Sequence, residues 1–288
     1  GLQPIEEFVD HAVAEKKPFF LWYGVFLPHT PHNPPERLLK PYRDMGLPLP
    51  IAKYYAMCTW FDETCGQLID LLEKRKLRDD TIIVYVTDNG WIQNPERNGY
   101  APRSKQTPYE GGIRTPWVVS WPAKFAGGRT IDAPVISLDI LPTAIDAMGT
   151  KGVAKRVFDG KSLLPLLMGK STAHHPVLYW NSGEPKGEWA VREGNWKAHG
   201  FKQKYELYDL ASDPSEKTDL ATKRPELAKR MAKRHETWLA EMVQSAGKNK
   251  TTGPGDRAAT TEPRPRDAAR EKKRAERIKA RQKKKQAK

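Results

Sequence analysis

The chain has 288 residues, a mean hydropathy of −0.71 and a formal net charge of +14 at pH 7. This length is enough for one large or two medium domains with a hydrophobic core. No apolar run approaches the roughly 20 residues that a membrane-spanning helix needs, so no membrane span is predicted. The sequence begins at Gly1, inside a helical pattern, and no signal peptide is visible in it, so we expect a truncated or processed chain.

The positive charge is concentrated near the C-terminus. Residues 264–288 contain 13 Lys and Arg against three Asp and Glu, so they carry +10 of the net charge. The rest of the chain is nearly balanced, which argues against a specific nucleic-acid-binding domain. Residues 247–288 have almost no apolar side chains, and we predict a basic, disordered tail there. This tail is either a solvated terminus or a segment that binds polyanions.

Helical and extended patterns alternate over the first 170 residues. Apolar spacing predicts three helices, over residues 4–15, 52–75 and 139–148. Apolar runs predict three strands, over residues 19–27, 81–87 and 116–121. The strand over 81–87 is apolar on both faces, which is typical of a central strand covered by helices on both sides. We therefore expect an α/β domain with a parallel or mixed sheet, joined by a proline-rich loop at 28–50 and a polar loop at 88–114.

The pattern changes after about residue 170. Short strands are predicted over residues 177–180, 189–192, 196–199 and 205–210. A hairpin turn is expected at 193–195, a Ser-Asp-Pro turn at 212–214, and an amphipathic helix over 225–243. The chain is therefore expected to have three parts: an α/β domain of residues 1–170, a small α+β subdomain of residues 171–246 (an antiparallel sheet with one helix), and the tail of residues 247–288.

The two cysteines, Cys58 and Cys65, lie seven residues apart in the helix predicted over 52–75. Seven residues of helix span about 10 Å, which is too far for a disulfide bond. Both belong to the apolar stripe of that helix, so we interpret them as small core residues.

The end of the strand over 81–87 is the most informative position for function. It continues into Thr-Asp-Asn-Gly at 87–90, and ligands of open α/β sheets bind beyond the carboxyl ends of strands. Asp88 and Asn89 offer two oxygen ligands of the kind that Ca²⁺ or Mg²⁺ prefers. The same residues also fit an ordinary Asp-Asn-Gly turn.

Two further polar groups lie at the same expected edge of the sheet. His29 and His32 follow the strand over 19–27 in a loop framed by prolines, and Lys105 precedes the strand over 116–121. Imidazoles serve as general acids or anion ligands, and a lysine pairs with anions. Taken singly, each of these residues also fits a structural or solvated side chain.

The ordered set of these motifs resembles the sulfatase (arylsulfatase) family of the alkaline-phosphatase-like superfamily. The set comprises Pro-His-Thr-Pro at 28–31, Thr-Asp-Asn-Gly at 87–90, Lys105, and Tyr-Glu-Gly-Gly-Ile-Arg-Thr-Pro at 109–116. Further matches follow at 159–167 and 206–216, so the resemblance covers about residues 1–245. It implies a partial alkaline-phosphatase-like mixed sheet flanked by helices.

The resemblance also implies a role for each candidate residue in the hydrolysis of a sulfate ester. Asp88 and Asn89 are similar to ligands of the catalytic Ca²⁺, which is Mg²⁺ in some members. His29 is similar to the histidine that contacts the sulfate and assists the leaving group. Lys105 is similar to the lysine that binds sulfate and protonates the bridging oxygen. His32 has no counterpart in the family pattern, and we assign it separately as a substrate-side contact. Trp91 departs from the family pattern, which often has a second glycine at that position.

One part of the family's machinery is missing from this sequence. The nucleophile is a formylglycine made from the Cys or Ser of a Cys/Ser-x-Pro-x-Arg motif, and the chain contains no such motif. The paired aspartates that complete the metal site are absent too. We therefore expect the C-terminal portion of a periplasmic or secreted sulfatase that is inactive alone and whose substrate is a sulfated small molecule or glycan. The alternatives are a phosphatase or phosphonate hydrolase of the same superfamily, and a non-catalytic protein that binds polyanions through its tail.

Overall fold

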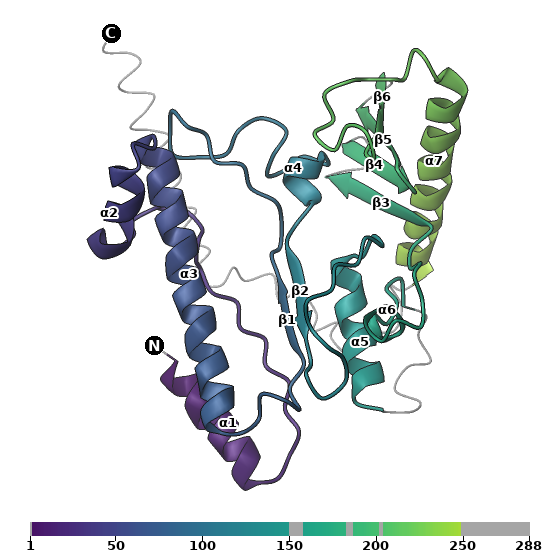
Figure 1. Ribbon diagram of the computed structural model, residues 1–288. Helices are drawn as coiled ribbons and strands as arrows, with labels where there is room; N and C mark the ends of the chain where they lie inside the picture. Colours follow the sequence, from purple (N-terminus) through teal and green to yellow (C-terminus); the bar gives the residue numbers. More distant parts are fainter. Residues whose placement is uncertain (1, 150–157, 183–186, 202–203, 249–288) are drawn as a thin grey trace, which may run out of the picture. The chain divides into compact units, whose positions relative to one another are not determined.

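The computed structural model describes residues 2–149, 158–182, 187–201 and 204–248 (Figure 1). Contacts divide the chain into two compact units, Gly1–Glu236 and Thr237–Lys288, and the packing described below belongs to the first. The basic tail predicted at 247–288 lies outside the described residues from position 249 onward. No helix in the described part of the chain is both long enough and apolar enough to cross a membrane.

Three helices precede the first strand, and helices and strands alternate after that up to a run of four strands and a final helix. The helices are α1 (Gln3–Ala14), α2 (Glu36–Asp44), α3 (Leu49–Lys74), α4 (Glu110–Ile113), the 3₁₀ turn η1 (Ser137–Asp139), α5 (Ile140–Ala147), α6 (Leu164–Leu167) and α7 (Pro225–Lys248). The strands are β1 (Ile83–Val86), β2 (Trp117–Ser120), β3 (Val177–Ser182), β4 (Glu188–Glu193), β5 (Trp196–Phe201) and β6 (Lys204–Asp209). The predicted α/β organisation is thus confirmed.

The first sheet consists of β1 and β2, which pair antiparallel with Ile83 opposite Ser120. The parallel pairing that the alternation suggested is not found among the described strands. Helix α3 lies beside β1, where the rings of Phe61 and Tyr85 are 5.7 Å apart. The leucines around α6 pack against Trp117 of β2. Cys58 and Cys65 are free, half-buried thiols on α3.

The strand predicted over residues 19–27 is wrong. Residues 17–26 have no regular secondary structure, and Phe20, Trp22 and Phe26 are 62%, 75% and 65% exposed. A strand needs a neighbour that accepts and donates its backbone hydrogen bonds. None of the described strands pairs with this segment, so its apolar pattern has no sheet to join.

Helix α2 lies inside the region that the sequence predicts as a proline-rich loop. Its two buried leucines, Leu38 and Leu39, pack against Ala52 and Ala56 of α3. Pro35 stands at the N-terminal cap of the helix, where a proline is tolerated because the first helical amides have no partner within the helix. The prolines therefore mark the beginning of a short helix as well as a loop.

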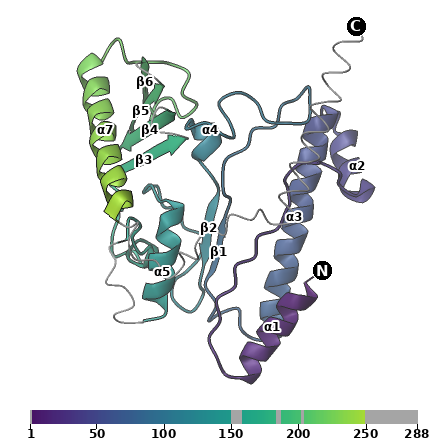
Figure 2. The same cartoon turned by 180° about the vertical axis from the view of Figure 1, so that it is seen from behind.

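The second sheet is an antiparallel meander in the order β3-β4-β5-β6, with α7 along one face (Figures 1 and 2). Its inner residues form a core with Ala228, Met231 and Ala232 of α7; from the sheet these are Trp189, Val191, Ala198 and Leu207. The predicted antiparallel sheet with one helix is confirmed.

The other face of this sheet carries charged and polar side chains that are nevertheless buried. Side chains alternate between the faces of a strand, so Lys197 and His199 of β5 lie opposite the face that Ala198 presents to α7. Their cross-strand partners on β6 are Tyr208 and Glu206. Lys197 is 0% exposed, and a buried ammonium requires close anionic partners.

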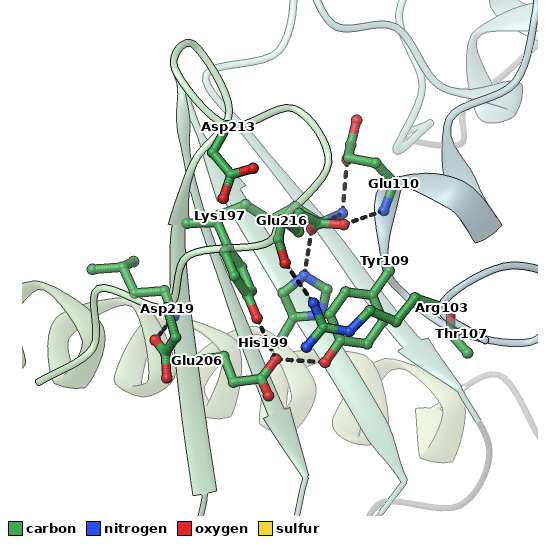
Figure 3. Close-up of polar contacts among 12 residues, drawn as sticks. Arg103, Thr107, Tyr109, Glu110, Lys197, His199, Glu206, Asp213, Glu216 and Asp219 are labelled. Carbon is green, nitrogen blue, oxygen red and sulfur yellow. Dashed lines mark hydrogen bonds and ion pairs between the residues drawn. The ribbon is translucent and has the colours of Figure 1, made fainter.

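These partners come from two separate segments (Figure 3). The Nζ of Lys197 donates to Oε1 of Glu110 at 2.7 Å and lies 3.0 Å from Oε1 of Glu216. The Nε2 of His199 lies 2.7 Å from the same oxygen of Glu216. The backbone amide of Glu110 also donates to the carboxylate of Glu216. One ammonium thus joins β5, α4 and the turn after β6.

Glu216 is presented by a tight turn. The carboxylate of Asp213 accepts hydrogen bonds from the amides of Lys217 and Thr218, both at 2.8 Å. Glu216 itself has a φ of +54°, a left-handed conformation that is uncommon for a residue with a side chain. The Ser-Asp-Pro turn predicted from the sequence therefore aims one carboxylate into the sheet face.

Arg103 and Tyr109 fasten the loop before α4 to the same sheet face. The ring of Tyr109 stacks on His199 with centroids 4.3 Å apart, and the guanidinium of Arg103 lies 4.5 Å from the centre of that ring. The hydroxyl of Tyr109 donates to Glu206, and Arg103 donates to the backbone carbonyl of Glu216. We call the four buried residues Lys197, His199, Glu110 and Glu216 the buried network; Arg103 and Tyr109 attach the loop to it.

Replacing Lys197 by methionine should strongly destabilise the protein. The variant leaves two carboxylates buried without their ammonium, and breaking a buried ion pair typically costs about 3–5 kcal/mol. Urea unfolding followed by circular dichroism measures the change. Lys229→Met, which removes an exposed i,i+3 pair, is the control and should leave the midpoint nearly unchanged. Equal midpoints for the two variants would contradict the account.

The network should also make the fold sensitive to acid. Burial lowers the pKa of His199 more than its hydrogen bond to Glu216 raises it. The unfolded chain therefore binds more protons than the native state below the ordinary histidine pKa of about 6.5. Stability should consequently fall as the pH drops from 7 towards 5. Urea midpoints measured across this range should show a smaller fall in His199→Gln, and an unchanged slope would refute this role.

Candidate functional site

A pocket of about 570 Å³ forms where two of the predicted loops meet. This volume lies in the range of roughly 300–1,000 Å³ that is common for small-molecule sites. The pocket is lined by His29, Thr30, Pro31, Trp91, Asn98, Gly99, Tyr100, Lys105 and Gln106. His29 and Lys105, which the sequence places in different loops, thus line one pocket.

The backbone around Lys105 is held in place by Ser104. The buried hydroxyl of Ser104 accepts a hydrogen bond from the amide of Ile92 at 2.6 Å. Arg103 precedes Ser104 and Gln106 follows Lys105, and these two outer residues have φ values of +56° and +70°. Such conformations cost about 1–3 kcal/mol each and persist only where the surroundings impose them. The lysine therefore stands on a strained turn that the buried network and Ser104 hold.

Glycines let the two motif loops approach each other. The amide of Gly90 donates to the carbonyl of Gly112 at 2.8 Å. A Cβ at Gly90 would lie 2.4 Å from the carbonyl oxygen of Gly111, and one at Gly112 would lie 2.3 Å from that of Thr107. The Asp-Asn-Gly and Glu-Gly-Gly motifs are thus in backbone contact, which larger residues would prevent.

Asp88 and Asn89 lie in the loop directly after β1, as expected, but neither lines the pocket. Asp88 is exposed. The side-chain amide of Asn89 donates to the carbonyl of Gly90 at 3.0 Å. They are near the pocket along the chain, because Trp91, which lines the pocket, follows Asn89 by two positions.

His32 lies behind the pocket wall and does not line the pocket itself. It is buried, with its ring 5.5 Å from that of Tyr54 and 5.9 Å from that of Trp91. Burial and the neighbouring His29 lower the pKa of His32. The structure therefore places His29 and Lys105 in one pocket, whereas His32 contacts the ring of Trp91 edge-on.

Trp91 is a pocket residue that the sequence marks only as a departure from a family pattern. Its ring stacks on Tyr54 at 6.0 Å and meets Tyr100 edge-on at 5.5 Å. The ammonium of Lys105 lies 5.7 Å from its centre, within cation–π range. The pocket thus combines an aromatic wall with a fixed cation and an exposed imidazole, which suits an anionic ligand that also has an apolar face.

Two family models match the chain. One, described as Sulfatase, matches residues 2–150, and the other, described as N-sulphoglucosamine sulphohydrolase, C-terminal, matches residues 101–243. The first therefore covers just over half of the chain and includes all five predicted site residues.

Curated relatives are sulfatases as well. N-acetylgalactosamine-6-sulfatase of Canis lupus familiaris is 27% identical over 203 residues, which are 69% of this chain and 37% of the relative. Arylsulfatase G of Mus musculus is 30% identical over 67% of this chain and 38% of its own length. Arylsulfatase A of Homo sapiens is 29% identical over 71% of this chain and 40% of its own length. The chain thus spans well under half the length of these relatives.

Solved structures share the fold. The crystal structure of Ps i-CgsB is 28% identical with a TM-score of 0.72 over 82% of this chain and 53% of its own. The phosphonate monoester hydrolase of Agrobacterium radiobacter is 23% identical, with a TM-score of 0.52, over 66% of this chain and 41% of its own. That second likeness shows the fold alone. The family models and the structural match agree, and this chain belongs to the sulfatase family.

Proposed function

We propose that the protein of which this chain is part is a metal-dependent sulfuric ester hydrolase, and that the pocket of His29 and Lys105 receives the sulfate group. The observation that carries the proposal is the meeting of these two side chains in one pocket beside an aromatic wall. An ammonium and an imidazole both donate hydrogen bonds to the oxygens of a sulfate, and the ammonium also pairs with its negative charge.

The chemistry assigned to these side chains follows from where charge develops. When the ester S–O bond breaks, negative charge accumulates on the bridging oxygen, and a proton donor or fixed cation there lowers the barrier. Lys105 supplies the cation, and its backbone is held before substrate arrives. His29 is exposed at the pocket, so it can reach the leaving oxygen.

The proposed metal is Ca²⁺, with Mg²⁺ as the other candidate, and Asp88 and Asn89 are its proposed ligands in this chain. Their carboxylate and amide oxygens fit a hard cation. Ca²⁺ takes 6–8 oxygen ligands, so two residues supply only part of a site. When bound, the ion offsets the negative charge of the sulfate and the nucleophile.

The missing ligands and nucleophile define what we propose for the whole protein. The chain has no Cys/Ser-x-Pro-x-Arg motif and spans only 37–40% of the curated sulfatases compared above. We assign residues 1–170 to the downstream part of a catalytic domain and residues 171–246 to its C-terminal subdomain. The formylglycine and the other metal carboxylates then lie in an upstream part, and this chain alone is inactive.

The proposed substrate is a sulfated glycan, with a sulfated small molecule as the second choice. Ps i-CgsB was solved in complex with k-i-k-neocarrahexaose, and another structural relative, 26% identical with a TM-score of 0.54, in complex with its substrate D-glucosamine-2-N, 6-O-disulfate. The aromatic wall of Trp91 and Tyr100 supports a ring-shaped substrate, since aromatic faces present flat apolar area. A periplasmic or secreted setting fits this substrate class.

Replacing Lys105 by alanine should lower kcat/KM about 100- to 1,000-fold, the usual effect of removing one preorganised charge-stabilising group. The measurement is turnover of an aryl sulfate by the protein expressed from its whole coding sequence. Lys124→Ala, which removes a lysine that lies over Trp121 outside the pocket, should retain wild-type activity. Activity of the Lys105 variant within a factor of two of wild type would contradict the assignment.

Removing the metal should abolish the same activity. Treatment of the whole protein with a chelator should stop turnover, and Ca²⁺ should restore it. Asp88→Ala should need a much higher Ca²⁺ concentration, whereas the exposed Asp132→Ala should behave as wild type.

The 288-residue chain by itself should turn over no aryl sulfate. Turnover by this chain that is lost in Asp88→Ala would overturn the claim that it is inactive alone.

A further inference from the structure

A second group of metal-type ligands lies outside the pocket and the motifs of the sulfatase reaction. It consists of Asp139 at the end of η1, directly before α5, and of His174 and His175 in the segment before β3. One ligand atom from each residue lies within 4.8 Å of the other two. The role proposed below does not rest on the proposed sulfatase activity.

Both imidazoles point their Nε2 atoms at the carboxylate of Asp139. The Nε2 of His174 lies 3.2 Å from Oδ2 of Asp139, and the Nε2 of His175 lies 2.8 Å from Oδ1 and 3.1 Å from Oδ2. The side chain of Asp139 is 0% exposed and each imidazole is 6% exposed. Three potential ligands therefore converge in an enclosed place.

The backbone holds the carboxylate of Asp139 in a fixed orientation. Its Oδ1 accepts a hydrogen bond from the amide of Lys161 at 2.8 Å, and its Oδ2 accepts one from the amide of Ile136 at 2.9 Å. These two bonds use part of the acceptor capacity and leave the rest directed at the histidines. Such supporting hydrogen bonds orient ligands in metal sites.

The nitrogen–oxygen spacings between the histidines and Asp139 are close to those around a tetrahedral metal ion. At metal–ligand distances of about 2.0–2.2 Å, neighbouring ligand atoms of a tetrahedral ion lie roughly 3.3–3.5 Å apart. The nitrogen–oxygen distance of His174 is 3.2 Å and that of His175 is 2.8 Å, so the first would open by roughly 0.1–0.3 Å and the second by roughly 0.5–0.7 Å to reach this spacing. Two imidazole nitrogens with one carboxylate oxygen are a donor set for Zn²⁺, whereas Ca²⁺ takes oxygen ligands.

We propose that Asp139, His174 and His175 form a binding site for a divalent transition metal of the Zn²⁺ class. Each neutral imidazole offers its Nε2 lone pair to the metal, and the ring proton then resides on Nδ1. Three protein ligands leave a fourth position for water. The metal links the beginning of α5 to the turn before β3, two places 35 residues apart along the chain, and so stabilises the fold.

One nearby group opposes binding and provides a test. The ammonium of Lys161 donates to the backbone carbonyl of His174 at 3.3 Å, so a positive charge lies near the proposed ion. Like charges at this range repel. Lys161→Gln keeps all three ligands and the backbone amide that supports Asp139, and it should bind the metal several-fold more tightly.

The experiment is a titration of the full chain with Co²⁺, whose visible absorption reports tetrahedral coordination. The measurements are made in a background with both cysteines replaced by serine and with excess Ca²⁺ present. We expect one Co²⁺ per chain, displaced by Zn²⁺ but not by Ca²⁺, and a melting temperature raised by several degrees with saturating Zn²⁺. His174→Gln and His175→Gln should each weaken binding at least 100-fold, because the amide keeps a donor to Asp139 but lacks the imidazole ligand. The exposed His11→Gln is the matched control.

Two results on the wild type and the histidine variants would overturn the site. One is the absence of saturable Co²⁺ binding to the wild-type chain. The other is equal affinity in the wild type, the His174 and His175 variants and the His11 control. Should a glutamine variant fail to fold by circular dichroism, the Lys161→Gln comparison decides, because unchanged or weaker binding in that variant also contradicts the proposal.

Discussion

The ammonium of Lys197 holds together the parts of the molecule on which the candidate site depends. It is fully buried between Glu110 and Glu216, and a charge in that position is tolerable only while both carboxylates stay in contact. Because Glu110 begins α4 and Glu216 lies in the turn after β6, the ion pairs fix the Glu-Gly-Gly motif to the C-terminal sheet. The sheet therefore acts as a support for a loop that is distant from it in sequence.

That support reaches the pocket through short steps. Arg103, held against Tyr109 and Glu216, is next to Ser104, and Ser104 bonds the amide of Ile92 beside Trp91. Lys105 follows Ser104 directly, so its position depends on contacts at both ends of the turn. In this arrangement the loop that carries Lys105 bears the strain of two left-handed residues, while the stability that offsets it lies in the network and in the core against α7.

Much of the architecture is local and could therefore be predicted from the sequence. The strands of the meander and α7 follow from alternation and helical periodicity. His29 and Lys105 line one pocket, but the sheet edge expected at His29 is not there, because the described residues before it form no strand. The apolar run over 19–27 predicts a strand that is not there, because a strand depends on neighbouring strands that a local pattern does not contain. The network was not predicted, because the contact of Lys197 with Glu110 joins positions 87 residues apart. Alternation in β5 gave one available signal, since Lys197 and His199 share a face opposite Ala198.

The carboxylate of Glu216 orders the loop that carries Lys105. Amide hydrogen exchange of the full chain tests this ordering most directly, because the amide of Glu110 donates to Glu216. In Glu216→Gln the amides of residues 103–112 should exchange much faster than in wild type, while those of α3 should keep their protection. Unchanged exchange over residues 103–112 in a folded Glu216→Gln variant would contradict the account.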